Sequence, residues 1–145
     1  MAPSARSMLN ERPIETFMII DDPSIKAELE AAFAAYEKAL VTNDVAALDG
    51  FFWPNESAIR YGAGENLYGY EAIRAFRAAR SPAGLARQLE KTRIVTYGRD
   101  CGVAATLFKR DGAEGKVGRQ MQTWIRFPEG WRIVAAHISI IDEGA

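Results

Sequence analysis

The chain has 145 residues, of which 48% are hydrophobic and 26% are charged. These proportions are typical of one soluble globular domain that can bury a core. A formal net charge of −1 excludes the strongly basic character that favours nucleic acids or anionic membrane surfaces. The single cysteine, Cys101, has no partner for a disulfide or for a cysteine-based metal site. With no secretory signal and no apolar run of membrane-spanning length, we expect a cytoplasmic protein.

The first part of the chain divides into a tail and a long helix. Residues 1–17 show no hydrophobic periodicity, so we expect a disordered tail before a single domain over residues 18–145. An Asp-Asp-Pro sequence that ends at Pro23 is typical of a helix start. Apolar residues then recur every three or four positions up to Val41. This spacing predicts an amphipathic helix with Tyr36 on its buried side.

Two shorter helices are expected on either side of a strand. Asp44 caps the first of them, which ends before Pro54. Residues 57–61 are a predicted strand, and residues 62–69, with three glycines, are a predicted loop. Helical spacing returns over residues 70–80.

The last part of the chain is rich in aromatic and β-branched residues and is divided by turn sequences. It predicts four long strands, over residues 86–97, 102–110, 118–127 and 131–141. Helices early and strands late indicate an α+β fold, with three N-terminal helices packed on one face of a curved, mainly antiparallel sheet. Curvature around the long helix would leave a tapered pocket at the open end of the sheet.

The final strand carries the only histidine of the chain, His137. Strict alternation predicts that His137 shares a face with Trp131 and Ile133. The opposite face is apolar, with Val134, Ala136, Ile138 and Ile140. An exposed apolar patch of this kind usually marks a contact with another protein chain, so we expect a homodimer through this face.

Several common catalytic and cofactor patterns are missing. The glycines of residues 62–69 do not have the spacing of a dinucleotide-binding fingerprint. No serine lies in a Gly-x-Ser-x-Gly sequence, and one histidine without a nearby carboxylate gives little support for zinc. The sequence therefore predicts neither a metal nor a cofactor.

Polar side chains on apolar elements are the candidate site residues. Arg60 lies in the middle of a predicted strand, where its planar guanidinium suits a carboxylate. It is alternatively a surface residue or a member of a structural ion pair. Tyr36 is a candidate acid or base beside Arg60, or alternatively a core tyrosine with a satisfied hydroxyl. His137 is a third catalytic candidate, or alternatively a hydrogen-bonded core histidine.

The remaining candidates are proposed to contact a substrate: Tyr61, Tyr70, Arg119, Gln122 and Trp124. Alternation places Gln120, Gln122 and Trp124 on one face of their strand and Arg119 on the other, but does not say which face looks inward. Tyr68 and Tyr70 are expected at the rim of the pocket. Arg74, Arg77 and Arg80 are interpreted as a solvated helix face.

Three segments carry a resemblance to a known family. They are Tyr36-Glu-Lys-Ala-Leu-Val-Thr-Asn-Asp44, the stretch from Arg60 to Arg80, and Gly118-Arg-Gln-x-Gln-Thr-Trp124. With the order of elements and the ending Gly-Trp-Arg-Ile-Val-x-x-His-x-Ser, the chain resembles the SnoaL-like, nuclear transport factor 2-like (NTF2-like) cone fold. More narrowly, it resembles the branch of the oxalurate-catabolism protein HpxZ and the cyanuric-acid-pathway protein AtzH.

This resemblance implies small ureido or carboxylated-urea ligands, amide hydrolysis, a homodimer, and no metal or cofactor. The expected function is cofactor-free hydrolysis of an amide C–N bond in a small anionic ureido compound. Arg60 would orient the carboxylate, Tyr36 would act as general acid or base, and His137 or a glutamine would position water. The alternative is a non-catalytic ligand-binding protein or an accessory protein of a separate amidase, because the fold hosts enzymes and binding proteins alike.

Overall fold

The computed structural model describes residues 18–144, so the predicted tail over residues 1–17 lies outside the described residues. The helices are α3 (Pro23–Val41), α4 (Val45–Phe51) and α5 (Tyr70–Ala79). The strands are β1 (Ile59–Tyr61), β2 (Asn66–Tyr68), β3 (Arg87–Tyr97), β4 (Cys101–Arg110), β5 (Lys116–Phe127) and β6 (Gly130–Asp142). The predicted order of elements is confirmed, with β2 as the one addition.

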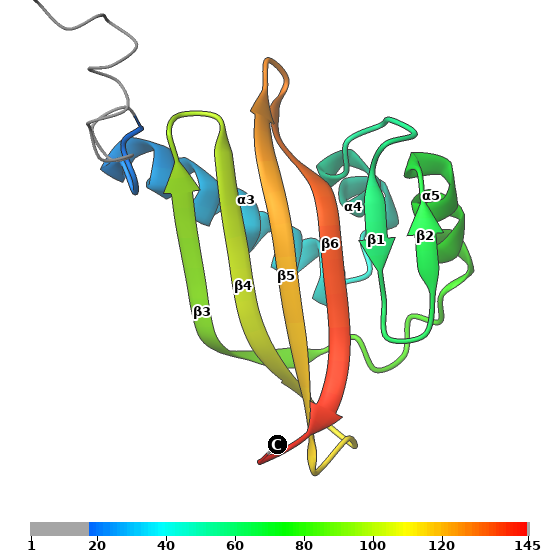
Figure 1. Ribbon diagram of the computed structural model, residues 1–145. Coiled ribbons are helices and arrows are strands. Elements are labelled where there is room, and N and C mark those ends of the chain that lie inside the picture. The colour runs from blue at the N-terminus through cyan, green and yellow to red at the C-terminus, as the bar shows by residue number, and fades with distance from the viewer. Residues whose placement is uncertain (1–17, 145) are drawn as a thin grey trace, which may run out of the picture.

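The six strands form one sheet in the order β2-β1-β6-β5-β4-β3 (Figure 1). Neighbouring strands are antiparallel except β1 and β6, which run parallel. The prediction of a loop over residues 62–69 is wrong in part, because residues 66–68 pair with β1. Three residues between glycines carry no strand signal of their own, and the partner strand supplies the hydrogen bonds that order them.

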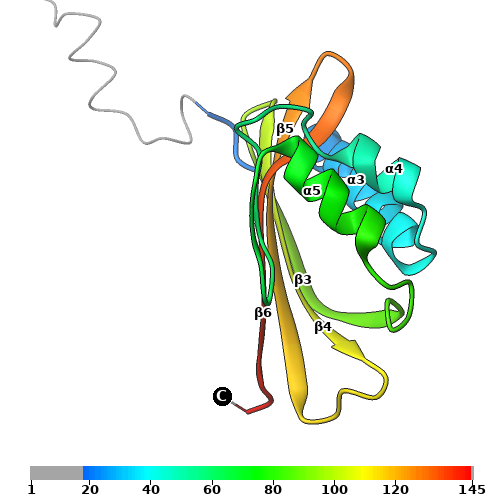
Figure 2. The same ribbon diagram turned by 90° about the vertical axis from the view of Figure 1, so that its right-hand side faces the viewer.

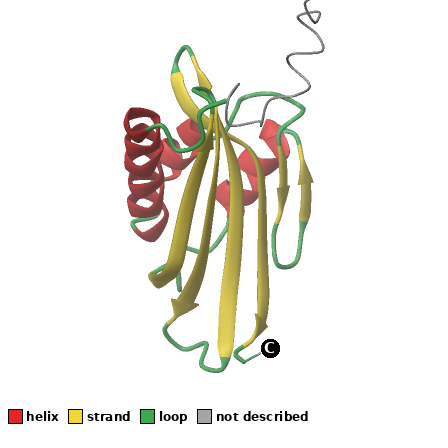
Figure 3. Ribbon diagram, turned by 60° about the vertical axis from the view of Figure 1, so that its left-hand side comes forward, coloured by secondary structure: helices red, strands yellow, loops and turns green. Residues whose placement is uncertain are grey.

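All three helices lie on the same face of the sheet (Figure 2). The sheet bends toward them at the ends of β3 and β4, and Figure 3 shows the opposite face bare of helices. This is the expected α+β cone with a curved, mainly antiparallel sheet. We call the helix-covered face the inner face and the bare face the outer face.

Two carboxylates fix the starts of α3 and α4. Asp22 accepts hydrogen bonds from the backbone N–H groups of Ser24 at 3.0 Å and Ile25 at 3.4 Å. Asp44 accepts one from the backbone N–H of Ala47 at 3.2 Å. These bonds satisfy donors that a helix end leaves unpaired, as the sequence predicts.

Within residues 18–144, the helices lack the length and hydropathy needed to span a bilayer.

An aromatic cluster joins α3 and α4 to β5. The rings of Tyr36, Phe51 and Trp124 contact one another edge to face, with centroid separations of 6.0 to 6.3 Å. Trp124 is fully buried, and Leu48 and Ile133 pack in the same core. This contact shows that Trp124, and with it alternate residues of β5, point to the inner face.

A β-bulge in β6 reverses the faces predicted for the last strand. Thr123 pairs with Ala135 but Trp124 pairs with Ile133, so Val134 is an extra residue. Ile133 therefore points inward while His137 points outward, and the prediction that they share a face is wrong. Ala136 is in the core rather than on an apolar outer surface. The predicted dimer face of Val134, Ala136, Ile138 and Ile140 is wrong for the same reason.

Candidate functional site

Tyr36 lies on the inner side of α3, where the helix crosses the sheet. Its side chain is 5% exposed, as the predicted buried stripe requires. The ring is held edge to face against Phe51 and Trp124, with interplanar angles of 81° and 90°. Packing on two sides fixes the direction of the phenol group.

Arg60 enters the inner side from β1. Its backbone pairs with Ala136 of β6, and Ala136 in turn pairs with Gln122 of β5, so the three residues form a row across adjacent strands. The guanidinium contacts the ring of Phe76 at 5.3 Å. It also forms an ion pair with Glu65 at 2.8 Å, so part of its binding capacity is used within the protein. The alternative of a structural ion pair is therefore also present.

Arg80 and Arg110 approach the same region from α5 and β4. Nε and Nη2 of Arg80, and Nε of Arg110, are sealed from solvent and have no hydrogen-bond partner among the described residues. Burial lowers the pKa of both guanidinium groups below the usual value. Tyr36 raises the pKa of Arg80, whereas the positive charges of Arg77, Arg60 and Arg110 lower it.

Gln122 adds a neutral donor to this group. It is 1% exposed, and its Oε1 accepts a hydrogen bond from Nε1 of Trp124 at 3.0 Å. Its Nε2 is sealed and has no partner among the described residues. The prediction left open which face of β5 looks inward, and the structure places Gln122 and Trp124 there and Arg119 on the other side.

We call Tyr36, Arg60, Arg80, Arg110 and Gln122 the donor cluster. Its four sealed and unpaired atoms, on Arg80, Arg110 and Gln122, are all nitrogen donors. Buried polar groups are nearly always paired, and each unpaired one costs free energy. The donor cluster therefore contains nitrogen donors whose hydrogen-bonding capacity is not used by the described residues. The other two such atoms in the described chain, on Asn43 and Thr96, belong to other parts of the fold.

Three predicted site residues lie on the outer face instead. His137 contacts the ring of Tyr61 edge to face at 5.9 Å, and the hydroxyl of Tyr61 lies 3.1 Å from that of Tyr68. Nε of Arg119 donates to Oγ of Ser139 at 3.0 Å. The sheet separates His137, Tyr61 and Arg119 from Tyr36, so of the predicted catalytic residues only Tyr36 and Arg60 share the inner face.

Tyr70 begins α5 and has a structural contact. Its hydroxyl donates to the backbone carbonyl of Asp49 at 3.2 Å, which joins α5 to α4. The same Asp49 binds Arg77 through its carboxylate at 2.8 Å, and Arg77 is 4% exposed. The interpretation of Arg77 and Arg80 as a solvated helix face is therefore wrong, whereas Arg74 is exposed as expected.

A second buried arginine is neutralised within the protein. Arg87 forms an ion pair with Glu37 and donates to Oε1 of Gln120 at 2.9 Å. The guanidinium carbons of Arg87 and Arg110 both lie near the ring of Phe108, 4.4 Å and 5.1 Å from its centroid. No carboxylate among the described residues forms an ion pair with Arg110 or Arg80. Unlike Arg60, Arg77 and Arg87, these two arginines therefore have no carboxylate partner among the described residues.

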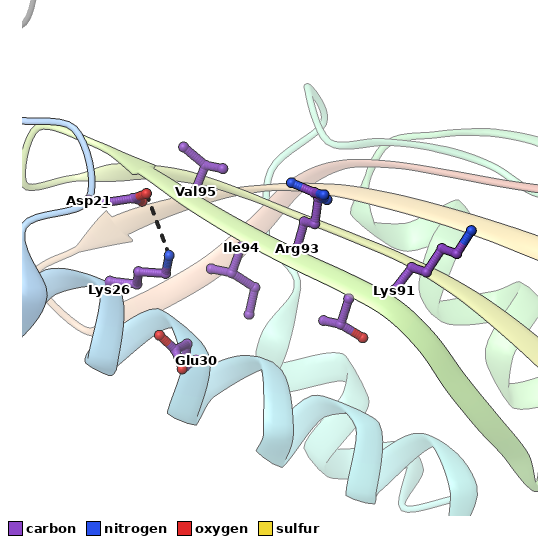
Figure 4. Close-up of a pocket in the computed structure, with 8 residues that line it drawn as sticks. Asp21, Lys26, Glu30, Lys91, Arg93, Ile94 and Val95 are labelled. Atoms are coloured by element: carbon purple, nitrogen blue, oxygen red, sulfur yellow. Dashed lines mark hydrogen bonds and ion pairs between the residues drawn. The ribbon is translucent and has the colours of Figure 1, made fainter.

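A broad surface pocket lies elsewhere, between the start of α3 and β3 (Figure 4). Its volume is about 760 Å³, and its walls carry both cations and anions, including Lys26, Glu30 and Arg93. Lys26 forms an ion pair with Asp21 at 3.5 Å across one end. None of the predicted site residues lines it. Within residues 18–144, His, Cys, Asp and Glu side chains do not gather in groups of three that could hold a metal ion.

Sequence reasoning missed Arg80 and Arg110, although one signal was available. Arg80 follows Ile73 by seven residues and Phe76 by four, so it continues the apolar stripe of α5. An arginine on such a stripe is buried rather than solvated. Arg110 gives no comparable signal, because it follows Lys109 at the end of a strand where either residue could point inward.

The family of this chain is shown by its similarity to known proteins. The AtzH-like family model matches residues 18–144. The chain belongs to the AtzH-like family. A comparison with curated proteins finds no match.

Solved structures agree with this family and fold. A protein of unknown function from the DUF3225 family, from Pectobacterium atrosepticum, is 58% identical over 85% of this chain and 95% of its own, with a TM-score of 0.83. A cystatin-like fold protein from Burkholderia xenovorans is 45% identical over 86% of this chain and 98% of its own, with a TM-score of 0.82. An NTF2-like superfamily protein from Salmonella enterica, 21% identical over 84% of this chain and 94% of its own, has a TM-score of 0.66 and shows the fold alone.

Proposed function

We propose that this AtzH-like protein binds a small anionic ureido compound in the donor cluster and hydrolyses its amide C–N bond without a cofactor. The observation that carries the proposal is the set of sealed nitrogen donors on Arg80, Arg110 and Gln122 that lack acceptors. A carboxylate and a neighbouring carbonyl supply such acceptors, and guanidinium groups bind carboxylates through paired hydrogen bonds. Carboxylated ureas and oxalurate have this chemistry.

The three arginines and the tyrosine of the cluster each have a role in this proposal. Arg80 and Arg110 bind the carboxylate, and Arg60 contributes to the extent that its pair with Glu65 allows. Their positive charge also stabilises the oxyanion that develops on the carbonyl under attack. Tyr36 acts as general acid and base beside Arg80.

Direct attack by water fits this cluster, because its members include no serine, cysteine or carboxylate nucleophile. The water oxygen bonds to the carbonyl carbon while Tyr36 accepts or relays the proton that water loses. The C–N bond then breaks, and the nitrogen leaves with the proton that Tyr36 returns. The products are a carboxylate or carbamate and an amine.

The alternative function is ligand binding without turnover, for example as a partner of a separate amidase. The ion pair between Arg60 and Glu65 favours it, because one of the three predicted catalytic residues is already engaged within the protein. Binding of carboxylated ureas without product release, or activity that appears only when an amidase is added, would select this alternative.

The test is turnover of oxalurate and carboxylated ureas by the purified protein, followed by release of product. Tyr36→Phe and Arg80→Met should each lower kcat/KM by about 100-fold or more. Arg74→Met, which removes an exposed guanidinium from the same helix, is the matched control. His137→Gln should also retain activity, because His137 lies on the outer face. Full kcat/KM in both Tyr36→Phe and Arg80→Met would refute the assigned roles.

We also propose that the protein is a homodimer through the outer face. Met121 is 57% exposed, and Ile59, Tyr61 and Val103 line a shallow apolar groove beside it. An exposed apolar sheet face of this kind favours a second protein surface over water. A second copy is the occupant, as the family resemblance implies.

A further inference from the structure

Trp124 holds the side-chain amide of Gln122 in one orientation. Nε1 of Trp124 lies 3.0 Å from Oε1 of Gln122, and both residues are buried. An indole N–H can only donate, so the atom of Gln122 that faces it must be the carbonyl oxygen. The amide nitrogen is therefore turned away from Trp124.

This nitrogen, Nε2 of Gln122, is one of the buried donors that have no hydrogen-bond partner among the described residues. Gln122 lies in the same row as Arg60, with Ala136 between them on the intervening strand. Adjacent strands are about 4.8 Å apart, so Arg60 and Gln122 are separated by roughly 10 Å at the backbone. The short side chain of Ala136 lets the polar ends of both neighbours reach one small molecule.

We propose that Trp124 is a positioning residue that fixes Gln122 as a donor, so that the site selects anions carrying a carbonyl oxygen in addition to their carboxylate. This inference rests on the proposed function, because the arginines must hold the carboxylate for Gln122 to meet the carbonyl. It adds that the side-chain amide of Gln122, oriented by the indole of Trp124, selects between ligands.

The selection has a physical cause. A ligand with a methylene in place of the carbonyl would leave the buried amide of Gln122 without an acceptor, whereas the carbonyl satisfies it. Sites built to hydrogen-bond a substrate group reject analogues that lack the group because their buried polar atoms stay unpaired. The expected preference is about tenfold to a hundredfold in Kd.

The experiment uses three monoanions that contain no C–N bond and therefore cannot be hydrolysed: pentanoate, 2-oxopentanoate and 4-oxopentanoate. Their Kd values are measured by isothermal titration calorimetry on the full-length protein. At least one oxo acid should bind the wild-type protein about tenfold or more tightly than pentanoate. Equal Kd values for all three would overturn the inference and leave the anion site in place. No binding of any of them would contradict the proposed function, and this inference with it.

Two variants then test which residues cause the preference for the oxo acid over pentanoate. Gln122→Met keeps the volume of the side chain and should abolish the preference for the oxo acid while pentanoate still binds. Trp124→Phe should reduce the preference, and should cause no further loss in the Gln122→Met background, because the indole acts through the amide. Additive losses in the double variant would overturn the positioning role. If Trp124→Phe does not fold, a retained preference in Gln122→Met overturns the inference by itself.

The hydrogen bond can also be observed without ligand. In ¹H–¹⁵N spectra, the indole N–H resonance of Trp124 should move upfield in Gln122→Met, because its acceptor is gone. An unchanged indole resonance would show that Gln122 is not the acceptor.

Discussion

The ring of Phe108 lies directly against Gly118, so close that a Cβ at position 118 would overlap the ring carbons. The two residues are paired neighbours on β4 and β5. The guanidinium groups of Arg87 and Arg110 both contact this ring, so the close approach of Phe108 to Gly118 also affects their surroundings.

Gly118→Ala should therefore destabilise the fold by about 1–3 kcal/mol, the usual range for an overpacked core. Urea denaturation followed by circular dichroism measures the change. Gly50→Ala is the matched control, because a Cβ at this helical position has no atom within 4 Å. It should stabilise the protein slightly. Equal stability of Gly118→Ala and wild type would show that Phe108 can move at little cost.

Asp49→Ala should be strongly destabilising, because it leaves the buried guanidinium of Arg77 without its carboxylate. Removal of one partner of a buried ion pair costs about 3–5 kcal/mol. Glu71→Ala is the control, since Glu71 is exposed and forms only a 3.7 Å surface pair with Arg74. That control should change the free energy of unfolding by less than about 0.5 kcal/mol. A similar small effect for Asp49→Ala would mean that Arg77 is hydrated when the carboxylate is gone.

Met121→Glu should convert the proposed dimer to a monomer, because it places a charge in the middle of the exposed apolar outer face. Analytical ultracentrifugation of wild type and variant at the same concentration measures the change. Val41→Glu, which adds the same charge at an exposed apolar position at the end of α3, should stay dimeric. A monomeric wild-type protein at micromolar concentration would remove the argument for this interface.

Asp22 should make the stability of the protein depend on acid pH. The hydroxyl of Ser24, followed by the backbone N–H of Ile25, lowers the pKa of the Asp22 carboxyl below its usual value. Its contribution is therefore complete above the usual aspartate pKa and is lost as the pH falls through the lowered value. Asp22→Asn keeps a capping oxygen that does not titrate, so its Tm should fall less than that of wild type between pH 5 and pH 2. Parallel Tm curves would contradict this assignment.

Sequence periodicity was sufficient for the elements whose environment repeats regularly. The three- and four-residue spacing of α3 placed Tyr36 on the buried side, and the Asp-Asp-Pro start gave the cap at Asp22. Alternation in β5 correctly grouped Gln122 with Trp124, although only the contact with Tyr36 shows that this face is the inner one.

The failures occur where a partner, rather than the local sequence, decides the structure. β2 forms because its backbone hydrogen-bonds to β1, whereas the sequence of its own three residues does not predict a strand. The extra residue Val134 is visible only in the pairing of β6 with β5, so alternation counted from Trp131 gave the wrong face for His137. Arg80 was misread for a different reason: its charge outweighed its position on an apolar stripe.

Val134 is the extra residue of the bulge in β6, so the inward-facing positions before it are odd-numbered and those after it are even-numbered. If this bulge were straightened with the chain length unchanged, alternation along β6 would be unbroken and Ala136 and His137 would exchange faces. An imidazole would then turn to the inner face, and a methyl group would replace it on the surface proposed for the dimer. The bulge at Val134 therefore determines the composition of the proposed binding site and of the proposed subunit contact together.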